Sequence, residues 1–204
     1  MSTDTQWSFD AIVLAGGEGI RLGGVDKAAV PVGGRPMLAH VLDAVRGARR
    51  TVVVGPPTLE TFGMDRVQED PPLGGPAAGL AAGLAHVGAG DEVPVVVLAC
   101  DLPLAVAVIP DLLEALAKGE AVDGAVVVDA DGRWQPLLAV YGRRALVAAV
   151  ERLEASGGVS GASMRRLLDG MVLVEVPDRT GAARDGDTWE AVAELDSIIT
   201  RRTT

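Results

Sequence analysis

The sequence predicts an α/β fold of three layers (α/β/α), in which helices cover both faces of a mostly parallel sheet. Short apolar runs without polar alternation, typical of buried parallel strands, alternate with longer stretches whose apolar residues recur at helical spacing. Strand–helix–strand succession of this kind gives a parallel sheet wrapped on both sides. Hydrophobic residues make up 49% of the 204 residues, enough for one well-formed core. We therefore expect residues 1–204 to form a single domain with its core at about 9–199.

The first half of the chain supplies three predicted strands and two predicted helices. The strands are the apolar runs at residues 11–15, 50–55 and 93–99. The helix at 36–45 begins with a proline, which suits a first helical turn, and its apolar residues share one face. A second helix, at 76–83, consists almost entirely of small residues.

The second half continues the alternation of strands and helices. Its predicted elements are helix 109–116, strands 125–128 and 137–141, helix 146–153, strand 171–176 and helix 189–199. The Asp131-Gly132 turn favours an antiparallel direction for the strand that follows it. Residues 178–187 are predicted to be the least regular stretch.

Composition and charge exclude several classes of function. The net charge of −10 argues against a non-specific nucleic-acid binder, because no basic surplus is available to neutralise phosphates. The single cysteine, Cys100, excludes an internal disulfide and a cysteine-cluster metal site. The first ten residues lack a signal region and no apolar run reaches membrane-spanning length. We therefore expect a soluble cytoplasmic protein without nucleic-acid or membrane partners.

The most informative stretch is residues 11–36, where a buried strand ends in Gly16-Gly17 and two cations follow. Ligands of open α/β sheets bind at the carboxyl ends of the strands. A loop with little side-chain bulk lets backbone N–H groups approach an anion there, and Arg21 and Lys27 add positive charge suited to a polyphosphate. The spacing fits neither the dinucleotide fingerprint nor a Walker loop. An ordinary glycine turn with surface charges is the alternative.

This stretch resembles the signature L-A-G-G-x-x-x-R-x-G-x-x-K of nucleotidyltransferases, in the form found in the MobA-like molybdenum cofactor guanylyltransferases. The match consists of Leu14-Ala15-Gly16-Gly17, Arg21, Gly23 and Asp26-Lys27. The resemblance implies a Rossmann-like sheet of the nucleotide-diphospho-sugar transferase type. It also implies catalytic roles for Arg21, Lys27 and Asp101 and a nucleotide site formed by Leu14, Ala15, Gly16, Gly17, Glu18, Gly19, Lys27, Asp70, Gly75 and Asp101.

Asp101 follows the apolar run at 93–99 and is the predicted metal ligand. An unpaired buried carboxylate costs several kcal/mol, so we expect a cationic partner. Mg²⁺ suits the position because it takes one or two carboxylates together with substrate phosphates. The family carries its metal-binding aspartate in an Asp-x-Pro pattern, met here as Asp101-Leu102-Pro103. A helix N-cap is the alternative role. The adjacent Cys100 is interpreted as a small core residue rather than a nucleophile.

Residues 69–79 form an irregular loop that leads into the small-residue helix, whose N-terminus can face an anion or a polar base edge. The family's G-P-x-A-G segment resembles residues 75–79, and its preceding aspartate, which helps to hold the guanine nucleotide, aligns best with Asp70. Glu69 is an equally close carboxylate. Close packing of the helix against the sheet is the other explanation for its small residues.

A fourth match lies before the last helix, where the family carries Asn/Asp-x-Asn/Asp-Thr-Pro-Glu-Asp. Asp185, Asp187 and Thr188 agree with it, whereas Trp189 replaces the proline. Asp187 is either a second magnesium ligand or, like Thr188, a plain helix cap.

Three weaker observations concern other parts of the chain. The segment 135–137 resembles the family's Q-P-L near the acceptor pocket. Gly55 stands where the family often has a nucleotide-contacting Asn, which leaves CTP open beside GTP. His40 and His86 are interpreted as packing or surface residues rather than ligands.

The expected reaction is transfer of GMP from GTP, with Mg²⁺, to a molybdopterin-type phosphate acceptor, with release of pyrophosphate. The expected partners are these substrates, with transient contact to cofactor-synthesis or molybdoenzyme proteins. The alternatives are a cytidylyltransferase or sugar-phosphate nucleotidyltransferase of the same fold, and a non-catalytic nucleotide-binding regulator.

Overall fold

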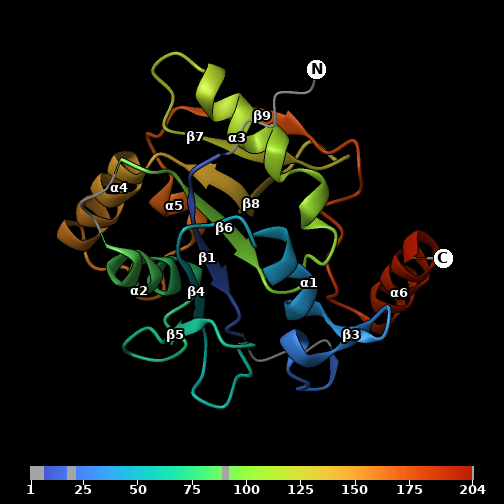
Figure 1. Ribbon diagram of the computed structural model, residues 1–204. Coiled ribbons are helices and arrows are strands. Elements are labelled where there is room, and N and C mark those ends of the chain that lie inside the picture. The colour runs from blue at the N-terminus through green and yellow to red at the C-terminus, as the bar shows by residue number, and fades with distance from the viewer. Residues whose placement is uncertain (1–6, 18–21, 89–91, 204) are drawn as a thin grey trace.

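A seven-stranded sheet forms the centre of the computed structural model, which describes residues 7–17, 22–88 and 92–203 (Figure 1). The strand order is β5-β4-β1-β6-β8-β7-β9. The strands are β1 (Asp10–Leu14), β4 (Thr51–Val54), β5 (Asp65–Val67), β6 (Val95–Ala99), β7 (Gly124–Val128), β8 (Trp134–Tyr141) and β9 (Leu173–Pro177). All neighbouring pairs are parallel except those made by β8, which is antiparallel to both β6 and β7. The mostly parallel sheet is confirmed, and so is the antiparallel strand after the Asp131-Gly132 turn.

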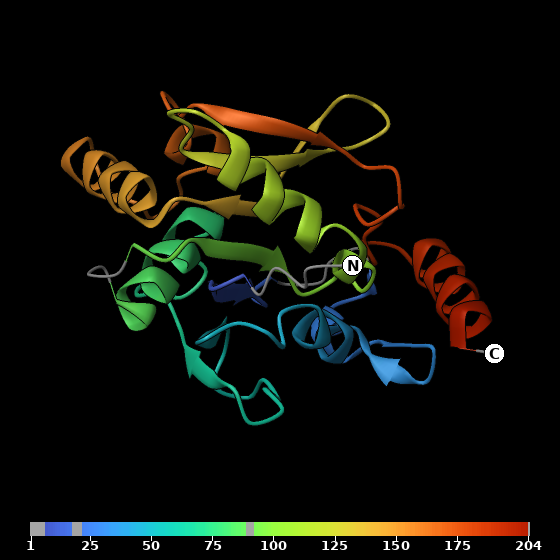
Figure 2. The same cartoon turned by 45° about the horizontal axis from the view of Figure 1, so that its top comes forward.

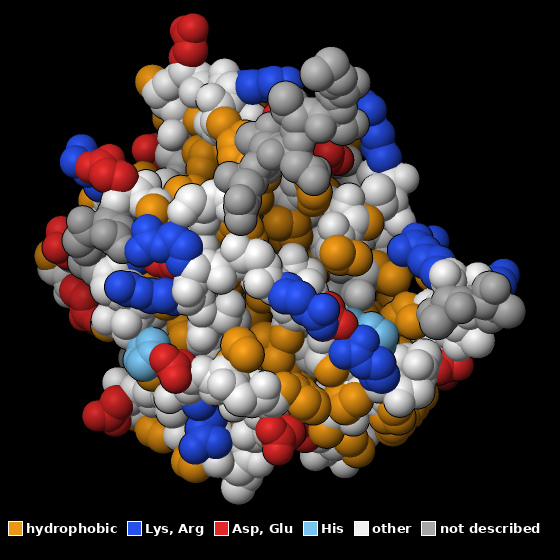
Figure 3. Space-filling view, viewed as in Figure 1, with side chains coloured by type: hydrophobic (Ala, Val, Ile, Leu, Met, Phe, Trp, Pro, Cys, Tyr) orange, Lys and Arg blue, Asp and Glu red, His pale blue; other side chains and the backbone are white. Residues whose placement is uncertain are grey.

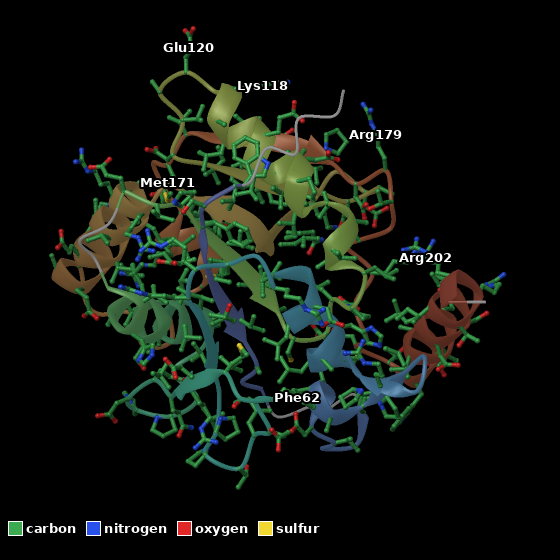
Figure 4. All side chains as sticks on the ribbon, in the orientation of Figure 1. Phe62, Lys118, Glu120, Met171, Arg179 and Arg202 are labelled. Carbon is green, nitrogen blue, oxygen red and sulfur yellow. The ribbon has the colours of Figure 1, made fainter. Side chains whose placement is uncertain are left out.

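Helices cover both faces of the sheet (Figure 2). They are α1 (Met37–Ala44), α2 (Pro76–Val87), α3 (Ile109–Lys118), α4 (Arg143–Ala155), α5 (Met164–Leu167) and α6 (Trp189–Thr203). Helices α1 and α3 pack on one face, and α2, α4 and α5 pack on the other, each with its own apolar core. The predicted three-layer arrangement is therefore confirmed, and Figure 4 shows side chains filling the space on both sides of the sheet.

Strand β1 shows why the sequence lacks polar alternation in this region. Ala11 and Val13 belong to the core on the α1 and α3 side, whereas Ile12 and Leu14 belong to the core on the α2 side. Because both faces of a central parallel strand are covered, every position of the strand is apolar after its first residue.

That first residue, Asp10, is fully buried and pairs with Arg143 at the start of α4. The guanidinium donates to the Asp10 carboxylate at 2.5 Å and to the carbonyl oxygen of Val93 at 3.0 Å. This pair fastens β1 to α4 at the edge opposite the carboxyl ends of the parallel strands.

The shortest strands and the shortest helix were not predicted from the sequence. The hairpin of β2 (Pro31–Val32) and β3 (Arg35–Pro36) was not among the predicted elements; its turn is formed by Gly33 and Gly34, both with positive φ. Strand β5 has three residues, two of them exposed, because it lies at the sheet edge and carries no apolar run. Helix α5 has only four residues. The stretch 178–187 contains no helix or strand, as predicted.

Helix α6 stands apart from the two main cores and packs on the β2–β3 hairpin through a third apolar cluster that contains Val32, Met37 and Ile199 (Figure 2). No helix in the described part of the chain is both long and apolar enough to cross a membrane. On the face drawn in Figure 3, acidic and basic side chains of the described residues are interspersed.

Candidate active site

A cavity of about 630 Å³ opens at the carboxyl ends of β1, β4 and β6. Its size is that of a small-molecule or cofactor site. The ends of these strands, the N-terminus of α2 and the loop before α6 all contribute to its walls. The structure thus brings together eight of the predicted site residues from distant parts of the sequence: Leu14, Ala15, Gly16, Gly17, Lys27, Gly75, Asp101 and Asp187. Glu18, Gly19 and Arg21 lie outside the described residues.

The floor of the cavity is formed where three strands end side by side. The N–H of Ala15 donates to the carbonyl oxygen of Val54 at 2.7 Å, and the N–H of Cys100 donates to that of Leu14 at 3.0 Å. Beyond this point Gly16 and Gly17 have open space where a side chain would be, and Gly17 has φ of 144°. The backbone of these two glycines is therefore accessible to a ligand, as the glycine-rich loop predicts.

Lys27 is positioned by a short 3₁₀ helix, Lys27–Ala29. Asp26 caps this helix, because its carboxylate accepts the N–H of Ala28 at 3.0 Å. The Lys27 ammonium then lies 3.2 Å from Oδ2 of Asp101 and donates a second hydrogen bond to Oδ1 of Asp187. Burial acts to lower the pKa of Lys27, but the hydrogen bonds and charges of the two carboxylates outweigh it and raise that pKa. Lys27 is therefore a fixed positive charge.

Asp101 does not cap a helix, so the alternative role considered for it is wrong. Helix α3 begins at Ile109 and its N-cap position is Val108. Instead, the Asp101 side chain, only 13% exposed, points at Lys27. Its backbone carbonyl accepts the N–H of Gly186 at 3.0 Å, which ties the loop before α6 to the end of β6.

Gly186 is required by the close approach of this loop to α1. A Cβ at position 186 would lie 2.7 Å from Cε of Met37, whose side chain is fully buried. This contact could not be predicted from the sequence, because the two residues are far apart in the chain. Gly186 therefore lets Asp187 reach the cavity.

The structure shows which of the two adjacent residues, Asp187 or Thr188, caps helix α6. The Thr188 hydroxyl accepts the N–H of Ala191 at 3.2 Å, which is the bond of an N-cap at the start of α6. The Asp187 carboxylate pairs with Lys27 instead. Partial burial, and then the charges of Asp187 and Asp101, raise the pKa of the nearby Asp185. Among the described residues, the carboxylates of Asp101, Asp185 and Asp187 thus gather near the one ammonium of Lys27.

These carboxylates fit a hard cation. Asp101 and Asp187 already bracket one positive group, the Lys27 ammonium. Two carboxylates completed by phosphate oxygens are a usual way for a protein to bind Mg²⁺. In the described residues, no group of three or more His, Cys, Asp or Glu side chains is placed to hold a metal ion. A magnesium ion here would therefore take its remaining ligands from substrate and water.

Cys100 belongs to the core cluster, as interpreted from the sequence. Burial, and then the charges of Asp101 and Asp26, raise the pKa of its thiol. The thiolate needed by a nucleophile is therefore suppressed.

The far end of the cavity is formed by the loop before α2 and by the start of that helix. Gly75 takes the N-cap position with φ of 86°, and Pro76 is the first helical residue. Both line the cavity, so the N-terminal end of α2 lies at its wall. Close packing also explains the small residues: a Cβ at Gly83 would lie 2.6 Å from Cγ2 of Ile12.

The carboxylate at this end belongs to Glu69. Glu69 is half-buried and lines the cavity, whereas Asp70 is exposed and is not among the lining residues. The resemblance pointed to Asp70, and sequence alone could not decide between adjacent residues of an irregular loop.

Packing also explains why position 55 is a glycine, where the family often has Asn. A Cβ at this position would lie 2.8 Å from Cδ2 of Leu59 and 3.0 Å from the carbonyl oxygen of Ala15. His40 and His86 are outside the cavity lining, with Nε2 atoms close to the carbonyl oxygen of Val32 and the carboxylate of Asp65 respectively.

A second hollow of about 360 Å³ is lined by residues of β8, the loop before α6 and α6 itself. Gln135 and Asp185 line it, each two residues from a lining residue of the main cavity, Leu137 and Asp187 respectively. Its charged lining residues are Arg133 and Arg184, which the sequence had not singled out, together with the carboxylates of Asp129, Asp185 and Glu194.

The comparison with known families agrees with the glycine-rich motif. A family model described as the MobA-like NTP transferase domain matches residues 11–175. The chain belongs to this family. A molybdenum cofactor guanylyltransferase from Pseudomonas putida is 35% identical over 173 residues, which cover 80% of this chain and 86% of that relative. The family resemblance read from the motifs is thereby confirmed.

Solved structures share the fold at lower identity. Molybdopterin-guanine dinucleotide biosynthesis protein A from Archaeoglobus fulgidus has a TM-score of 0.70 at 21% identity, covering 95% of this chain and all of that one. The 2-C-methyl-D-erythritol 4-phosphate cytidylyltransferase from Thermus thermophilus has a TM-score of 0.69 at 20% identity, covering 94% and 98%. These similarities show that the chain has the nucleotidyltransferase fold. The molybdopterin-guanine dinucleotide biosynthesis protein and the cytidylyltransferase share this fold.

Proposed function

We propose that this protein is a molybdenum cofactor guanylyltransferase that transfers GMP from GTP to the phosphate of a molybdopterin acceptor. The observation that carries the proposal is the cluster of Lys27, Asp101 and Asp187 beside Gly16-Gly17, in a cavity of nucleotide size. The name of the Pseudomonas putida relative supports the choice of guanylyl transfer and of the acceptor.

The strand order suggests how the substrates lie. The cavity runs from the β5 and β4 side, through the ends of β1 and β6, toward β8. In the proposed arrangement the base occupies the end of the cavity near α2. The triphosphate lies over Gly16 and Gly17, next to Lys27. The acceptor approaches from the second hollow, where Arg133 and Arg184 would have to exchange their ion-pair partners, Asp131 and Glu194, for the acceptor phosphate.

In the reaction an oxygen of the acceptor phosphate forms a bond to the α-phosphorus of GTP. The bond from that phosphorus to the oxygen bridging to the β-phosphate breaks, and pyrophosphate leaves with that oxygen. The acceptor oxygen is already ionised, so no general base is required. The protein's task is to align two anions and to stabilise the charge of the transition state.

Each charged residue has a role in that task. Lys27, with Arg21 as a second cation, holds the phosphates of GTP. Asp101 and Asp187 would hold Mg²⁺, which would supply positive charge to offset that of the phosphates. Because Lys27 carries its charge on a side chain that is only 25% exposed, its attraction for phosphate is weakly screened.

The test is pyrophosphate release with GTP, CTP and ATP, each with Mg²⁺ and molybdopterin-bearing cofactor. We expect the highest kcat/KM for GTP, and no acceptor-dependent release by Asp101→Ala. A clear lead for CTP would make the protein a cytidylyltransferase. Nucleotide binding without any turnover would favour the non-catalytic regulator.

A further inference from the structure

The loop between β9 and α6 carries Asp187 across the sheet to the cavity. It starts at the end of β9, an edge strand, whereas Asp101 follows β6, and β7 and β8 lie between these two strands. Three strand spacings correspond to about 14 Å. Residues 178–187 cover this span without a helix or a strand (Figure 1). The position of the Asp187 carboxylate therefore depends on the contacts that fix an irregular loop.

The side chain of Asp178 organises the first half of this loop. Its Oδ1 accepts the N–H groups of Thr180, Gly181 and Ala182 at 3.0, 2.8 and 3.0 Å. The same oxygen accepts the Thr180 hydroxyl at 3.1 Å, and Oδ2 accepts the N–H of Ala183 at 2.8 Å. Successive N–H groups that converge in this way form a concave site for an anion. Here the anion is a side chain of the loop itself, so the loop is closed around it.

Asp178 is anchored and ionised in this position. Its own N–H donates to the carbonyl oxygen of Val128, at the end of β7, at 2.8 Å. Burial acts to raise the pKa of Asp178, but the hydrogen bonds from the loop outweigh it and lower that pKa. Ala182 is fully buried in the core on the α1 and α3 side, where water cannot replace the carboxylate as a partner for its N–H.

The second half of the loop is short and fixed at its far end. The N–H of Gly186 donates to the carbonyl oxygen of Asp101 at 3.0 Å. Only Arg184 and Asp185 separate Gly186 from Ala183, the last residue that is bonded to Asp178. Because two residues leave little slack, a displacement of Ala183 is passed on to Gly186 and to the carboxylate that follows it.

We propose that Asp178 is a positioning residue for the reaction, which places the Asp187 carboxylate beside Asp101 by closing the loop at residues 178–183. This inference rests on the proposed function, in which Asp187 and Asp101 would hold Mg²⁺. Asp178 is not among the described residues that line the cavity or the second hollow, so it acts only through the loop.

The test is the factor by which Mg²⁺ strengthens GTP binding, obtained from the dissociation constants of GTP with Mg²⁺ and with EDTA. Asp178→Ala is expected to reduce this factor by on the order of 10-fold, because a misplacement of about 1 Å at a reacting centre can cost about 10²-fold. Affinity for GTP in EDTA should not fall. Asp178→Asn keeps Oδ1 as an acceptor and should cause a smaller reduction. It decides the inference if Asp178→Ala fails to fold.

Asp123→Ala is the matched control. Oδ2 of Asp123 accepts the N–H of Val172 at 2.8 Å, next to the opposite ends of β7 and β9. This variant also removes a carboxylate that holds backbone, but away from the cavity, so the effect of Mg²⁺ on GTP binding should stay at the wild-type value. Amide hydrogen exchange gives a second readout that needs no turnover. Exchange in residues 180–186 should become faster in Asp178→Ala and remain unchanged in Asp123→Ala.

The remaining outcomes separate this inference from the proposed function. Asp187→Asn should reproduce the loss seen in Asp178→Ala. A wild-type response to Mg²⁺ in Asp178→Ala or in Asp187→Asn, or an equal loss in Asp123→Ala, would overturn the inference. If the binding and exchange results are as expected but the wild type forms no guanylyl product, the proposed function falls and the positioning role of Asp178 stands.

Discussion

Replacement of Lys27 by Met is the most informative perturbation of the candidate active site. The ammonium lies 3.2 Å from Asp101, and both side chains are largely buried. At an effective dielectric constant of about 20, the attraction between two unit charges at this distance is about 5 kcal/mol before desolvation is subtracted. Met keeps the length of the side chain and removes only the charge.

Turnover should fall much more than stability in this variant. Removal of one preorganised group that stabilises transition-state charge typically lowers kcat by about 10²–10³. We therefore expect kcat/KM for GTP to fall by about 100-fold or more, which corresponds to about 2.7 kcal/mol. Asp101 and Asp187 lose their shared cation in the free protein, but both retain contact with water, so the variant should still fold.

The assay is acceptor-dependent pyrophosphate release at saturating Mg²⁺, with thermal unfolding as the check on folding. Lys118→Met is the matched control, because Lys118 pairs with Glu114 on the exposed surface of α3. It should have wild-type activity, since exposed pairs contribute little. A Lys27→Met enzyme within threefold of the wild type would refute the role assigned to this charge.

Three other predictions follow from the site and the core. Asp101→Asn should shift the magnesium titration of activity to higher concentration, and an unchanged curve would show that Asp101 is no ligand. Gly186→Ala should lower kcat/KM by roughly tenfold, because the added methyl group would lie 2.7 Å from Cε of Met37 and displace the loop that carries the second carboxylate; wild-type kinetics would contradict this. Arg143→Met should cost about 3–5 kcal/mol of unfolding free energy in urea, because it removes the hydrogen-bonded guanidinium from the buried Asp10 and leaves it the more distant Arg49, 3.7 Å away; a loss below about 1 kcal/mol would contradict the importance of the pair.

The sequence was sufficient to predict those helices and strands in which burial determines the positions of the apolar residues. Residues 11–15 lie between two covered faces, so their apolar character predicts a central strand, and β1 is found at Asp10–Leu14. The same holds for the spacing of apolar residues in α3 and α6. Edge strand β5 escaped prediction because its residues are exposed and leave no periodic signal.

The candidate site was predictable at the end that holds Lys27 and Asp101 and less so at the end formed by the loop before α2. Asp101 follows the end of β6 and Lys27 lies on the connection that follows β1, and the carboxyl ends of these neighbouring parallel strands lie at the same edge of the sheet. Which carboxylate of the pair 69–70 faces the cavity depends on the path of an irregular loop, and this path is set by contacts such as the bond from Leu73 to Glu69. The separate roles of Asp187 and Thr188 likewise depend on where α6 begins, which adjacent capping residues do not determine.

The most direct test of the central claim is the identity of the product. Wild-type protein, GTP, Mg²⁺ and molybdopterin-bearing cofactor should yield the guanine dinucleotide form of the cofactor, identified by mass spectrometry, with one pyrophosphate released per dinucleotide formed. Asp101→Ala, incubated in parallel, should form neither product. Pyrophosphate without the dinucleotide, a cytosine dinucleotide formed in preference from a mixture of GTP and CTP, or no product from wild-type protein that binds both substrates would contradict the account.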